Sequence, residues 1–287
     1  MNTEKYLVKE GQKVDLKDFS TKRDEKLKRE VVERTLMPDN IRQMAELQEK
    51  LYAENTSSLL IVFQAMDAAG KDSSIKHVMK GFNPQGVKVA SFKVPSSEEN
   101  DHDYLWRIHK EVPRRGEIGI FNRSHYEDVI VSKVHNLIES SQLPPELQTE
   151  DIFKKRYRQI RDYERYLYEN GTMVVKFYLH LSKEEQKERL LERIENPDKN
   201  WKFSAGDVRE REYWDLYMNA YEAMLENTST DVAPWYVLPA DNKWFTRYLI
   251  SEILLEKLKE MDPQFPEFPE EQRENMEKCR KLLEKED

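Results

Sequence analysis

Short apolar runs alternate with longer stretches of helical spacing along most of the chain, and this alternation strongly limits the folds that the chain can adopt. The runs have the length of strands, and the first, SLLIVFQAM, is apolar on both faces, as in a central parallel strand. Strands that alternate with helices predict a doubly wound α/β sheet in three αβα layers. Five parallel strands are expected, at 58–66, 86–94, 116–124, 172–181 and 234–240.

Composition divides the chain into three predicted parts. Residues 1–57 are charged and form a predicted N-terminal helical extension, residues 58–260 hold the predicted core, and residues 261–287 form a charged tail broken by prolines. A helical lid is expected within the core, over about residues 183–226. Helical spacing also covers 74–80, 101–111, 125–137, 149–169 and 243–259.

The charge balance and the single cysteine exclude several classes of protein. With 47 basic and 55 acidic residues, the net charge of −8 disfavours a general nucleic-acid binder, but clustered basic residues can still bind a polyanion. The run KKRYRQIR at 154–161 is either such a cluster or a solvated face.

Cys279 alone cannot form a disulfide framework. Because neither a signal peptide nor a bilayer-spanning run is visible, we expect a cytoplasmic protein without a membrane partner.

A phosphate-binding loop is predicted directly after the first strand. Such a loop needs a strand, a turn of small residues and a helix start, so that backbone N–H groups and a lysine face the anion. The turn AMDAAGKD at 65–72 has Ala65 and Asp72 where the usual G-x-x-x-x-G-K-[ST] loop has Gly and Ser/Thr. A tight strand-to-helix turn without a ligand is the alternative. The residues expected to bind phosphate here are Ala68, Ala69, Gly70, Lys71, Asp72 and Ser73.

Asp67 points to a cation, because a carboxylate inside a phosphate cradle repels the ligand unless a cation lies between them. Mg²⁺ prefers carboxylate and phosphate oxygens, so Asp67 is a candidate metal ligand; the alternative is that it only caps the next helix. The third strand ends in Asn122 and Arg123, and the carboxyl ends of parallel strands share one crevice. There Asn122 would be a neutral ligand and Arg123 a bidentate phosphate donor. Glu127 and Asp128 lie one turn further on, and from their spacing alone we expect them on a solvated helix surface.

A basic helical hairpin follows the fourth strand. Ser182 and Glu185 form a capping box, and Arg189 and Arg193 share one face of the helix that this box starts. If the hairpin closed over phosphates, it would exclude water and add positive charge near the transferring group. The alternative is an ordinary surface helix with i,i+4 Glu–Arg pairs. The basic residues that follow the first helix are Lys199, Lys202, Arg209 and Arg211.

Three segments, FQAMDAAGKDSSIKHVM, FNRSHYEDV and NPDKNWKFSAGDVRERE, together resemble the motifs of the polyphosphate kinase 2 family, in the expected order and spacing. The resemblance covers about residues 59–247. It implies a P-loop kinase-like core with a helical lid, a homodimer or homotetramer, and Mg²⁺ or Mn²⁺ as the metal. It also implies reversible phosphoryl transfer from inorganic polyphosphate to ADP and AMP, with use in ATP regeneration, and leaves guanine nucleotides open as further acceptors.

The resemblance also implies roles for single residues. Asp67 and Lys71 match the loop carboxylate and the catalytic lysine of the family, and Arg123 matches the phosphate-binding arginine of its second motif. Arg193 matches a lid arginine, with Arg189 as a close rival. The predicted catalytic set is therefore Asp67, Lys71, Arg123 and Arg193.

Two positions distinguish this chain within the family. Asn122 stands where the second motif often has Asp, so the predicted metal site pairs Asp67 with a neutral ligand. Glu127 resembles the branch that accepts AMP as well as ADP, whereas other branches tend to carry Asn there. The predicted nucleotide- and phosphate-binding residues are Ala68, Ala69, Gly70, Asp72, Ser73, Asn122, Glu127, Arg189, Lys199, Lys202 and Arg209.

Two other functions fit parts of the sequence. An ATP-dependent nucleoside monophosphate kinase shares the fold but favours a standard Gly-rich loop. A non-catalytic phosphate-binding protein has no need to keep Asp67, Lys71 and Arg123 together. Phosphotransfer is favoured, and it requires no catalytic base because a nucleotide phosphate oxygen is already anionic. Asp67 is then a metal ligand rather than a proton acceptor.

Overall fold

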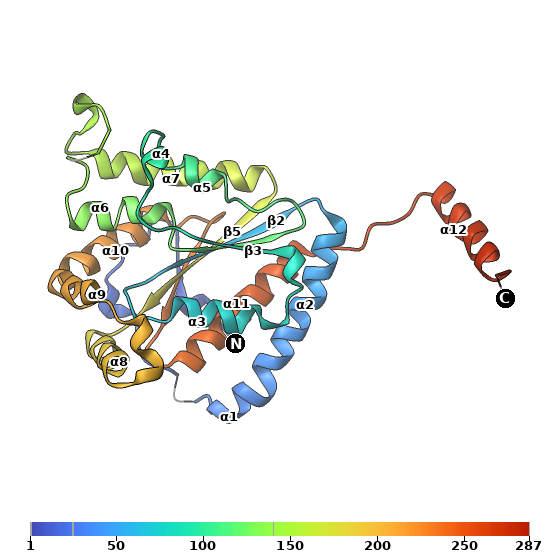
Figure 1. The fold of residues 1–287 in the computed structure, drawn as a ribbon, viewed down its shortest axis with the longest axis horizontal. Helices are drawn as coiled ribbons and strands as arrows, with labels where there is room; N and C mark the ends of the chain where they lie inside the picture. Colours follow the sequence, from blue (N-terminus) through green and yellow to red (C-terminus); the bar gives the residue numbers. More distant parts are fainter. Residues whose placement is uncertain (1, 25, 140, 287) are drawn as a thin grey trace.

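The computed structural model describes residues 2–24, 26–139 and 141–286 and contains a six-stranded sheet with helices on both faces (Figure 1). The strand order across the sheet is β1-β6-β5-β2-β4-β3. All neighbouring strands are parallel except β1 and β6, which are antiparallel. The strands are β1 (Leu7–Val8), β2 (Ser58–Gln64), β3 (Val87–Ser91), β4 (Ile118–Asn122), β5 (Thr172–His180) and β6 (Trp235–Pro239).

The five predicted strands are all present, but the predicted count of five was wrong by one. The additional strand, β1, lies within the N-terminal region and pairs Leu7 with Tyr236 and Val8 with Trp235. Two residues are too few to show an alternating pattern, so periodicity could not reveal this strand. β1 covers the outer edge of β6, and β3 forms the opposite edge of the sheet.

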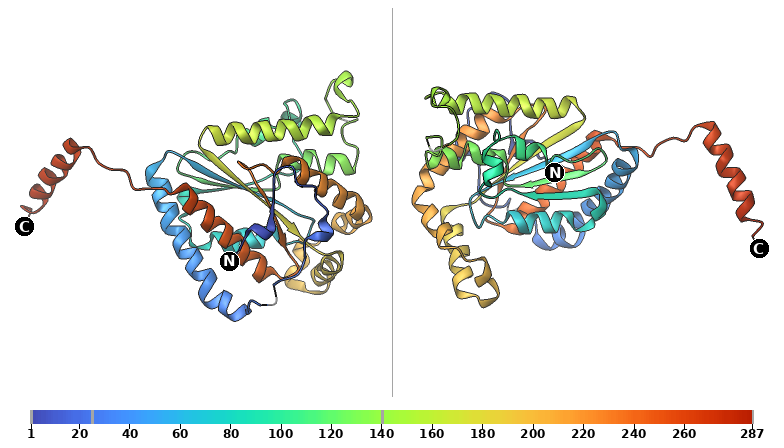
Figure 2. Two further views of the ribbon diagram at one scale, coloured as in Figure 1. Left: turned by 180° about the vertical axis from the view of Figure 1, so that it is seen from behind. Right: turned by 45° about the horizontal axis from the view of Figure 1, so that its top comes forward.

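The apolar side chains of β2 alternate between two cores, as expected for a strand buried on both faces. Leu59, Ile61 and Phe63 pack in one core, while Leu60 and Val62 pack in the other. Figure 2 shows the same two layers of helices from other directions. The first core is covered by α2 (Met37–Glu54), α3 (Lys71–Val78) and α11 (Lys243–Met261). The second is covered by α5 (Trp106–His109), α7 (Ile152–Glu169) and α10 (Trp214–Thr228).

Two predicted helices are much shorter than their apolar spacing indicated. In place of a helix over 101–111, only α5 forms, because Asp103 accepts a hydrogen bond from the Leu105 backbone N–H (2.9 Å) and turns the chain first. In place of a helix over 125–137, there is a 3₁₀ turn at His125–Asp128, which Ser124 caps, and then α6 (Val131–Val134). Side chains that bond to nearby backbone compete with regular helix formation.

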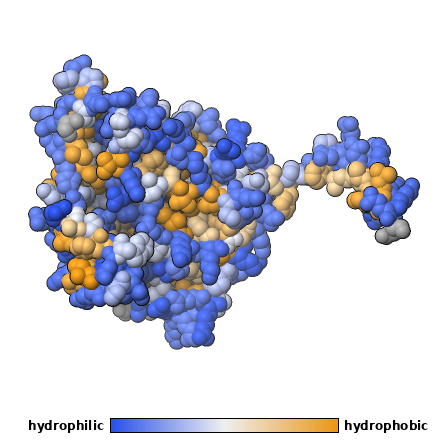
Figure 3. Space-filling view, viewed as in Figure 1, coloured by the Kyte–Doolittle hydropathy of each residue, from blue (hydrophilic) through white to orange (hydrophobic). Residues whose placement is uncertain are grey.

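The remaining helices lie outside the two main layers. α8 (Lys183–Glu195) and α9 (Ala205–Arg209) lie beyond the carboxyl ends of the strands, and α12 (Glu270–Leu283) stands away from the body at the end of an extended segment (Figure 1). Apolar side chains are exposed on α12 (Figure 3), and the large ones are Met276, Leu282 and Leu283. The two other short helices are α1 (Arg29–Val31) and α4 (Ser97–Asn100). Within the described parts of the chain, no helix has both the length and the apolar character of a membrane span.

Candidate phosphate-binding site

The turn between β2 and α3 has the geometry of an anion-binding loop. β2 ends at Gln64 and α3 begins at Lys71, so the strand, turn and helix follow one another as the sequence predicts. The first N–H groups of α3 have no partner within the helix and carry the positive end of its dipole. Such a helix start is an anion site when small residues precede it, because backbone and ligand can then approach closely.

The turn contains two left-handed residues, Ala68 with φ +63° and Gly70 with φ +101°. Gly adopts this conformation readily. An Ala in the same region is strained by about 1–2 kcal/mol, because its Cβ approaches the following carbonyl. The backbone of the loop is therefore held in a shape that Ala68 does not favour by itself.

The Lys71 side chain folds back across the loop. Its Nζ donates a hydrogen bond to the Ala65 carbonyl, 2.8 Å away. Burial lowers the pKa of Lys71, and the negative charge of Asp67 opposes this shift. A polyanion bound at this loop would favour the charged ammonium, so the binding of phosphate and the protonation of Lys71 are coupled.

A second loop meets the first at the end of β4. Arg123 Nη2 lies 2.9 Å from Asp67 Oδ1, and the two side chains are 43% and 27% exposed. Arg123 has a φ of +64°, and its N–H donates to the Phe63 carbonyl at 3.2 Å. This left-handed conformation is unfavourable for a non-glycine residue, so the surrounding contacts must hold it. The strand end thus presents a guanidinium beside the carboxylate of the loop.

The oxygen donors at this junction fit a metal shared with a ligand. Asp67 and Asp72 lie on the first loop, and Asn122 Nδ2 donates to Asp72 Oδ1 at 2.5 Å. Among the described residues, no group of three or more His, Cys, Asp or Glu side chains is arranged to hold a metal ion. Mg²⁺ is commonly held through one or two carboxylates together with substrate phosphates and water. Asp67 and its neighbours suit that arrangement and not an all-protein cage.

Glu127 is half-buried and not part of a solvated helix surface. Burial raises the pKa of Glu127, and the positive charges of Arg123 and Lys71 oppose the increase. Asp128 is also half-buried, and its carbonyl and carboxylate accept hydrogen bonds from Arg156 at 2.6 and 3.3 Å. Glu127 is therefore coupled electrostatically to the two cations of the loop junction, while Asp128 contacts α7.

A cleft of about 500 Å³ lies over the loop and extends toward α8 and α11. Its acidic residues are Asp67, Asp72 and Glu192. Basic residues clearly outnumber them, so an acidic chain concentrates positive charge here, as binding a polyanion requires. The basic residues that line the cleft are Lys71, Lys93, Arg123, Arg189, Arg193, Lys199, Lys202, Lys243 and Arg247.

Most of the predicted site residues lie together in this cleft, but two do not line it. Glu127 is half-buried and coupled to Arg123 and Lys71 without lining the cleft, and Arg209 is exposed at the end of α9. Three further basic residues that the sequence did not predict line the cleft: Lys93, Lys243 and Arg247. Each of them follows a strand, β3 or β6, and the rule that ligands bind at the carboxyl ends of strands could have found them.

The two candidate lid arginines have different surroundings. Arg193 is partly exposed, forms an ion pair with Asp207 at 2.7 Å, and donates to the Lys202 carbonyl at 3.3 Å. Arg189 is only 5% exposed and contacts the backbone of the phosphate loop. Lys199 forms an ion pair with Glu192. Of the two arginines, Arg193 is the more accessible to a bound molecule.

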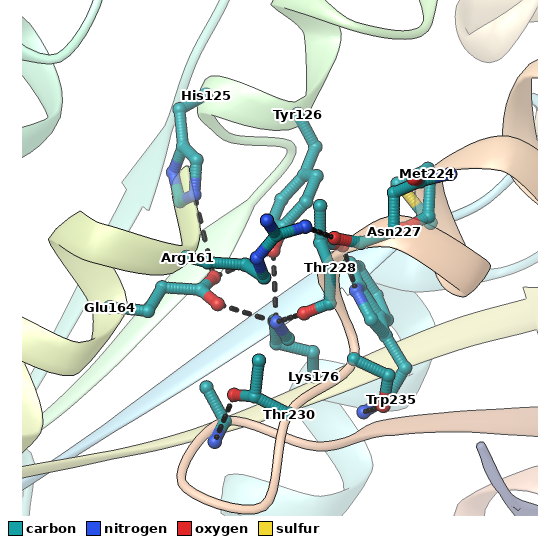
Figure 4. A network of polar contacts seen from close by, with 12 residues as sticks. His125, Tyr126, Arg161, Glu164, Lys176, Met224, Asn227, Thr228, Thr230 and Trp235 are labelled. Atoms are coloured by element: carbon teal, nitrogen blue, oxygen red, sulfur yellow. Dashed lines mark hydrogen bonds and ion pairs between the residues drawn. The ribbon is translucent and has the colours of Figure 1, made fainter. Parts of the chain in front are cut away.

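A buried polar network supports the second loop from behind (Figure 4). Lys176 on β5 is fully buried, and its Nζ donates to Glu164 Oε2 (2.5 Å), the Tyr126 hydroxyl (2.9 Å) and the Thr228 carbonyl (2.8 Å). The Tyr126 hydroxyl donates to Glu164 Oε1 at 2.7 Å. Burial lowers the pKa of Lys176, and the Glu164 carboxylate opposes the shift. The network anchors Tyr126, which lies in the turn between Arg123 and Glu127.

Known proteins share both the sequence and the fold. Residues 26–266 match the model of the family described as Polyphosphate kinase 2 (PPK2). The chain is 47% identical over 263 residues to an ADP-polyphosphate phosphotransferase of Rhodopseudomonas palustris, covering 91% of each protein. It is 51% identical over 224 residues to an AMP/ADP-polyphosphate phosphotransferase of Meiothermus ruber, covering 78% of this chain and 80% of the relative. The crystal structure of Polyphosphate Kinase 2 from Arthrobacter aurescens TC1 has a TM-score of 0.80 and 41% identity, covering 87% of each chain.

Proposed function

Because the chain belongs to the polyphosphate kinase 2 family, as its motifs predicted, we propose that it transfers the terminal phosphoryl group of inorganic polyphosphate to ADP and to AMP. The observation that carries this proposal is the basic cleft over the strand–loop–helix turn, with Lys71, Asp67 and Arg123 at its floor. Polyphosphate and ATP contain the same anhydride bond. The same phosphate loop therefore binds either molecule, and the reaction runs in either direction.

The transfer forms one bond and breaks another of the same kind. An anionic oxygen of the nucleotide's terminal phosphate attacks the end phosphorus of polyphosphate, and the anhydride bond behind that phosphorus breaks. The electron pair stays on the bridging oxygen, which becomes the new end of the shortened chain. Such transfers depend on positioning and on neutralising charge, so no side chain has to accept a proton.

Each residue at the cleft floor has a proposed role in this transfer. The N–H groups at the start of α3 and the Lys71 ammonium hold the bridging region, and Arg123 contacts the equatorial oxygens. Asp67, with Asn122 and Asp72 nearby, would hold Mg²⁺ or Mn²⁺. When bound, that metal neutralises charge on the phosphates. The ion pair with Asp67 keeps the Arg123 guanidinium beside the position of the ligand.

We propose that the predicted lid, residues 183–226, closes over the phosphates through its exposed part, because α10 packs in the second core and stays in place. Large apolar side chains of this segment are solvent-exposed, including Trp201 (78%) and Phe203 (47%), and closure would cover such surface. Lys199 and Lys202 line the cleft from this segment and would add charge on closing, together with Arg193. Exclusion of water would then protect the transferring group from hydrolysis.

The predictions made from the sequence about domain bounds, location, assembly and further acceptors are retained as proposals. We place the catalytic core at 58–260, with an N-terminal extension before it and a charged tail after it. A cytoplasmic homodimer or homotetramer is proposed, and guanine nucleotides are proposed as further acceptors.

A donor and acceptor screen tests the proposal. Purified protein with Mg²⁺ and polyphosphate as the sole donor should form ATP from ADP, and ADP from AMP, with Lys71→Ala purified in parallel as the control for contaminating kinases. If no ATP forms from ADP, the proposal is wrong. Transfer from ATP to AMP without any use of polyphosphate would identify an ATP-dependent nucleoside monophosphate kinase. Phosphate binding without transfer would identify a non-catalytic protein.

A further inference from the structure

The guanidinium of Arg189 uses its full hydrogen-bonding capacity within the protein. Nη1 donates to the carbonyls of Ala68 (3.0 Å) and Ala69 (2.9 Å), and Nη2 donates to those of Ala240 (2.7 Å) and Asp241 (3.1 Å). Nε donates to Glu185 Oε1 at 2.8 Å. An arginine carries five N–H groups in a fixed planar fork, so each has an acceptor here and none is left for a phosphate.

The four carbonyls that Arg189 contacts belong to two separate segments. Ala68 and Ala69 form the phosphate loop, whereas Ala240 and Asp241 follow β6. Arg189 therefore connects the loop to a strand two positions away across the sheet, because β5 lies between β6 and β2. A lysine could not make this connection, since its ammonium is a single point and not a planar fork.

The loop needs stabilising contacts from other segments because its backbone is strained. Ala68 is left-handed (φ +63°), and its carbonyl is one of those that Arg189 binds. The Ala69 N–H already donates to the Met66 carbonyl at 3.3 Å. Because Arg189 holds the Ala69 carbonyl, the next peptide plane, between Ala69 and Gly70, is fixed, and so is the Gly70 N–H group. Preorganised N–H groups stabilise developing charge without having to reorient during the reaction.

Other contacts keep the base of α8 in place beside Arg189. Gln186 Nε2 donates to the Asp67 carbonyl at 3.0 Å. The Ser182 N–H donates to Asp241 Oδ1 at 2.9 Å, and the Thr21 hydroxyl donates to Asp241 Oδ2 at 2.7 Å. The first two turns of α8 are thus hydrogen-bonded to the loop and to the end of β6, and they form a fixed part of the phosphate-binding site.

From this geometry we propose that Arg189 is a positioning residue, which holds the phosphate loop in its active shape and does not itself contact the transferred phosphate. The inference rests on the proposed function and differs from the prediction made from the sequence, in which Arg189 binds the ligand or rivals Arg193 as the lid arginine. It also places the moving part of the lid beyond Arg189. Arg193 is left as the arginine of α8 that meets the ligand.

Steady-state kinetics of Arg189→Lys test the role while keeping the charge. We expect kcat to fall by at least about 10-fold, because the fork geometry is lost, and the KM for polyphosphate to change by less than about 3-fold. Lys187→Met, on the exposed face of the same helix, is the matched control and should retain kcat. A wild-type kcat in Arg189→Lys would overturn the proposal. So would an increase in KM at constant kcat, which is the signature of a residue that binds the donor directly.

If Arg189→Lys is less stable than the wild type, hydrogen exchange and chemical rescue still distinguish a positioning role of Arg189 from a role in stability alone. Amide exchange at 66–71 should accelerate in Arg189→Lys, while exchange in β5 stays as in the wild type. Arg189→Ala should regain activity when guanidinium ion is added at concentrations well below those that unfold proteins, whereas Lys71→Ala should not. Acceleration spread over the whole sheet, or equal lack of rescue in both variants, would mean that Arg189 only stabilises the fold.

The two proposals can fail separately. If the wild-type protein does not use polyphosphate, the proposed function fails, and the exchange measurement still reports whether Arg189 holds the loop. If the wild type is active and Arg189→Lys matches it in both kcat and loop exchange, only the positioning role is wrong.

Discussion

Arg123 Nη2 and Asp67 Oδ1 lie 2.9 Å apart and join the two loops that form the floor of the cleft. Both side chains are partly exposed, so the contact can exchange for ligand contacts without a large cost of desolvation. In the absence of phosphate, each residue keeps the other in place. When polyphosphate and metal bind, Asp67 can turn to the cation and Arg123 to the anion.

Removing the lysine of the loop should abolish most turnover. Lys71→Ala deletes a charge that stabilises the transition state, so we expect kcat to fall by at least about 10²-fold. The measurement is ATP formation from ADP and polyphosphate at saturating Mg²⁺. The nearby exposed residue Lys76, mutated to Ala, serves as the control. Turnover close to normal in Lys71→Ala would contradict the proposed mechanism.

Asp67→Asn should weaken the binding of the metal ion. The change keeps the shape of the side chain but removes the charge that holds a divalent cation, so the concentration of Mg²⁺ needed for half-maximal activity should increase by at least about 10-fold. A titration of activity with Mg²⁺ measures this. An unchanged midpoint with reduced stability would indicate that Asp67 only pairs with Arg123; it does not cap α3, whose N-cap is Gly70 without a side-chain hydrogen bond.

Glu127→Asn should change the choice of acceptor. Glu127 is half-buried and coupled to Arg123 and Lys71, so we expect the variant to lose more kcat/KM with AMP than with ADP, by about 10-fold or more. The two acceptors are compared at the same polyphosphate and Mg²⁺ concentrations. Equal losses with AMP and ADP would remove the link between this residue and the use of AMP.

Binding of polyphosphate should take up protons at alkaline pH. Burial lowers the pKa of Lys71 below its ordinary value of 10.5, and a bound polyanion raises it again. Between these two pKa values the free lysine is neutral and the bound one is charged. Affinity should therefore fall as the pH rises through this window. Calorimetry in two buffers of different ionisation enthalpy measures the uptake, which should disappear in Lys71→Arg.

The buried pair of Lys176 and Glu164 allows a test of the support behind the second loop. Lys176→Met leaves Glu164 buried without its cation, and we expect the free energy of unfolding to fall by about 3–5 kcal/mol. Replacing both residues, as Lys176→Met with Glu164→Leu, should restore most of this loss, because no charge then remains buried. Urea unfolding compares the variants. A double variant no more stable than the single one would show that the polar contacts to Tyr126 dominate.

Much of the fold could be predicted because it depends on apolar periodicity. The strand at 58–66 is buried on both faces, and its pattern shows this directly. β1 was missed because two residues carry no pattern, and the helices expected at 101–111 and 125–137 were cut short by side chains such as Asp103 and Ser124 that bond to the backbone.

The prediction of the site succeeded where the chemistry depends on residue type. It failed where the position of a side chain depends on its backbone hydrogen-bond partners. Asp67, Lys71 and Arg123 lie together at the strand ends, as expected. The surroundings of Arg189 could not be predicted, because its acceptors are mainly carbonyl oxygens, which every residue possesses and which leave no trace in the sequence. Its spacing from Arg193 placed both on one face of α8 but did not show which one is buried.

The backbone carbonyls that Arg189 binds also explain how a loop spelled AMDAAGKD can keep its shape. Main-chain oxygens persist whatever side chain is attached, so mutation at Ala69 or Ala240 leaves the acceptors in place. Residues of this turn other than Asp67, Gly70 and Lys71 can then vary during evolution, provided that Arg189 and the space for its planar guanidinium are retained.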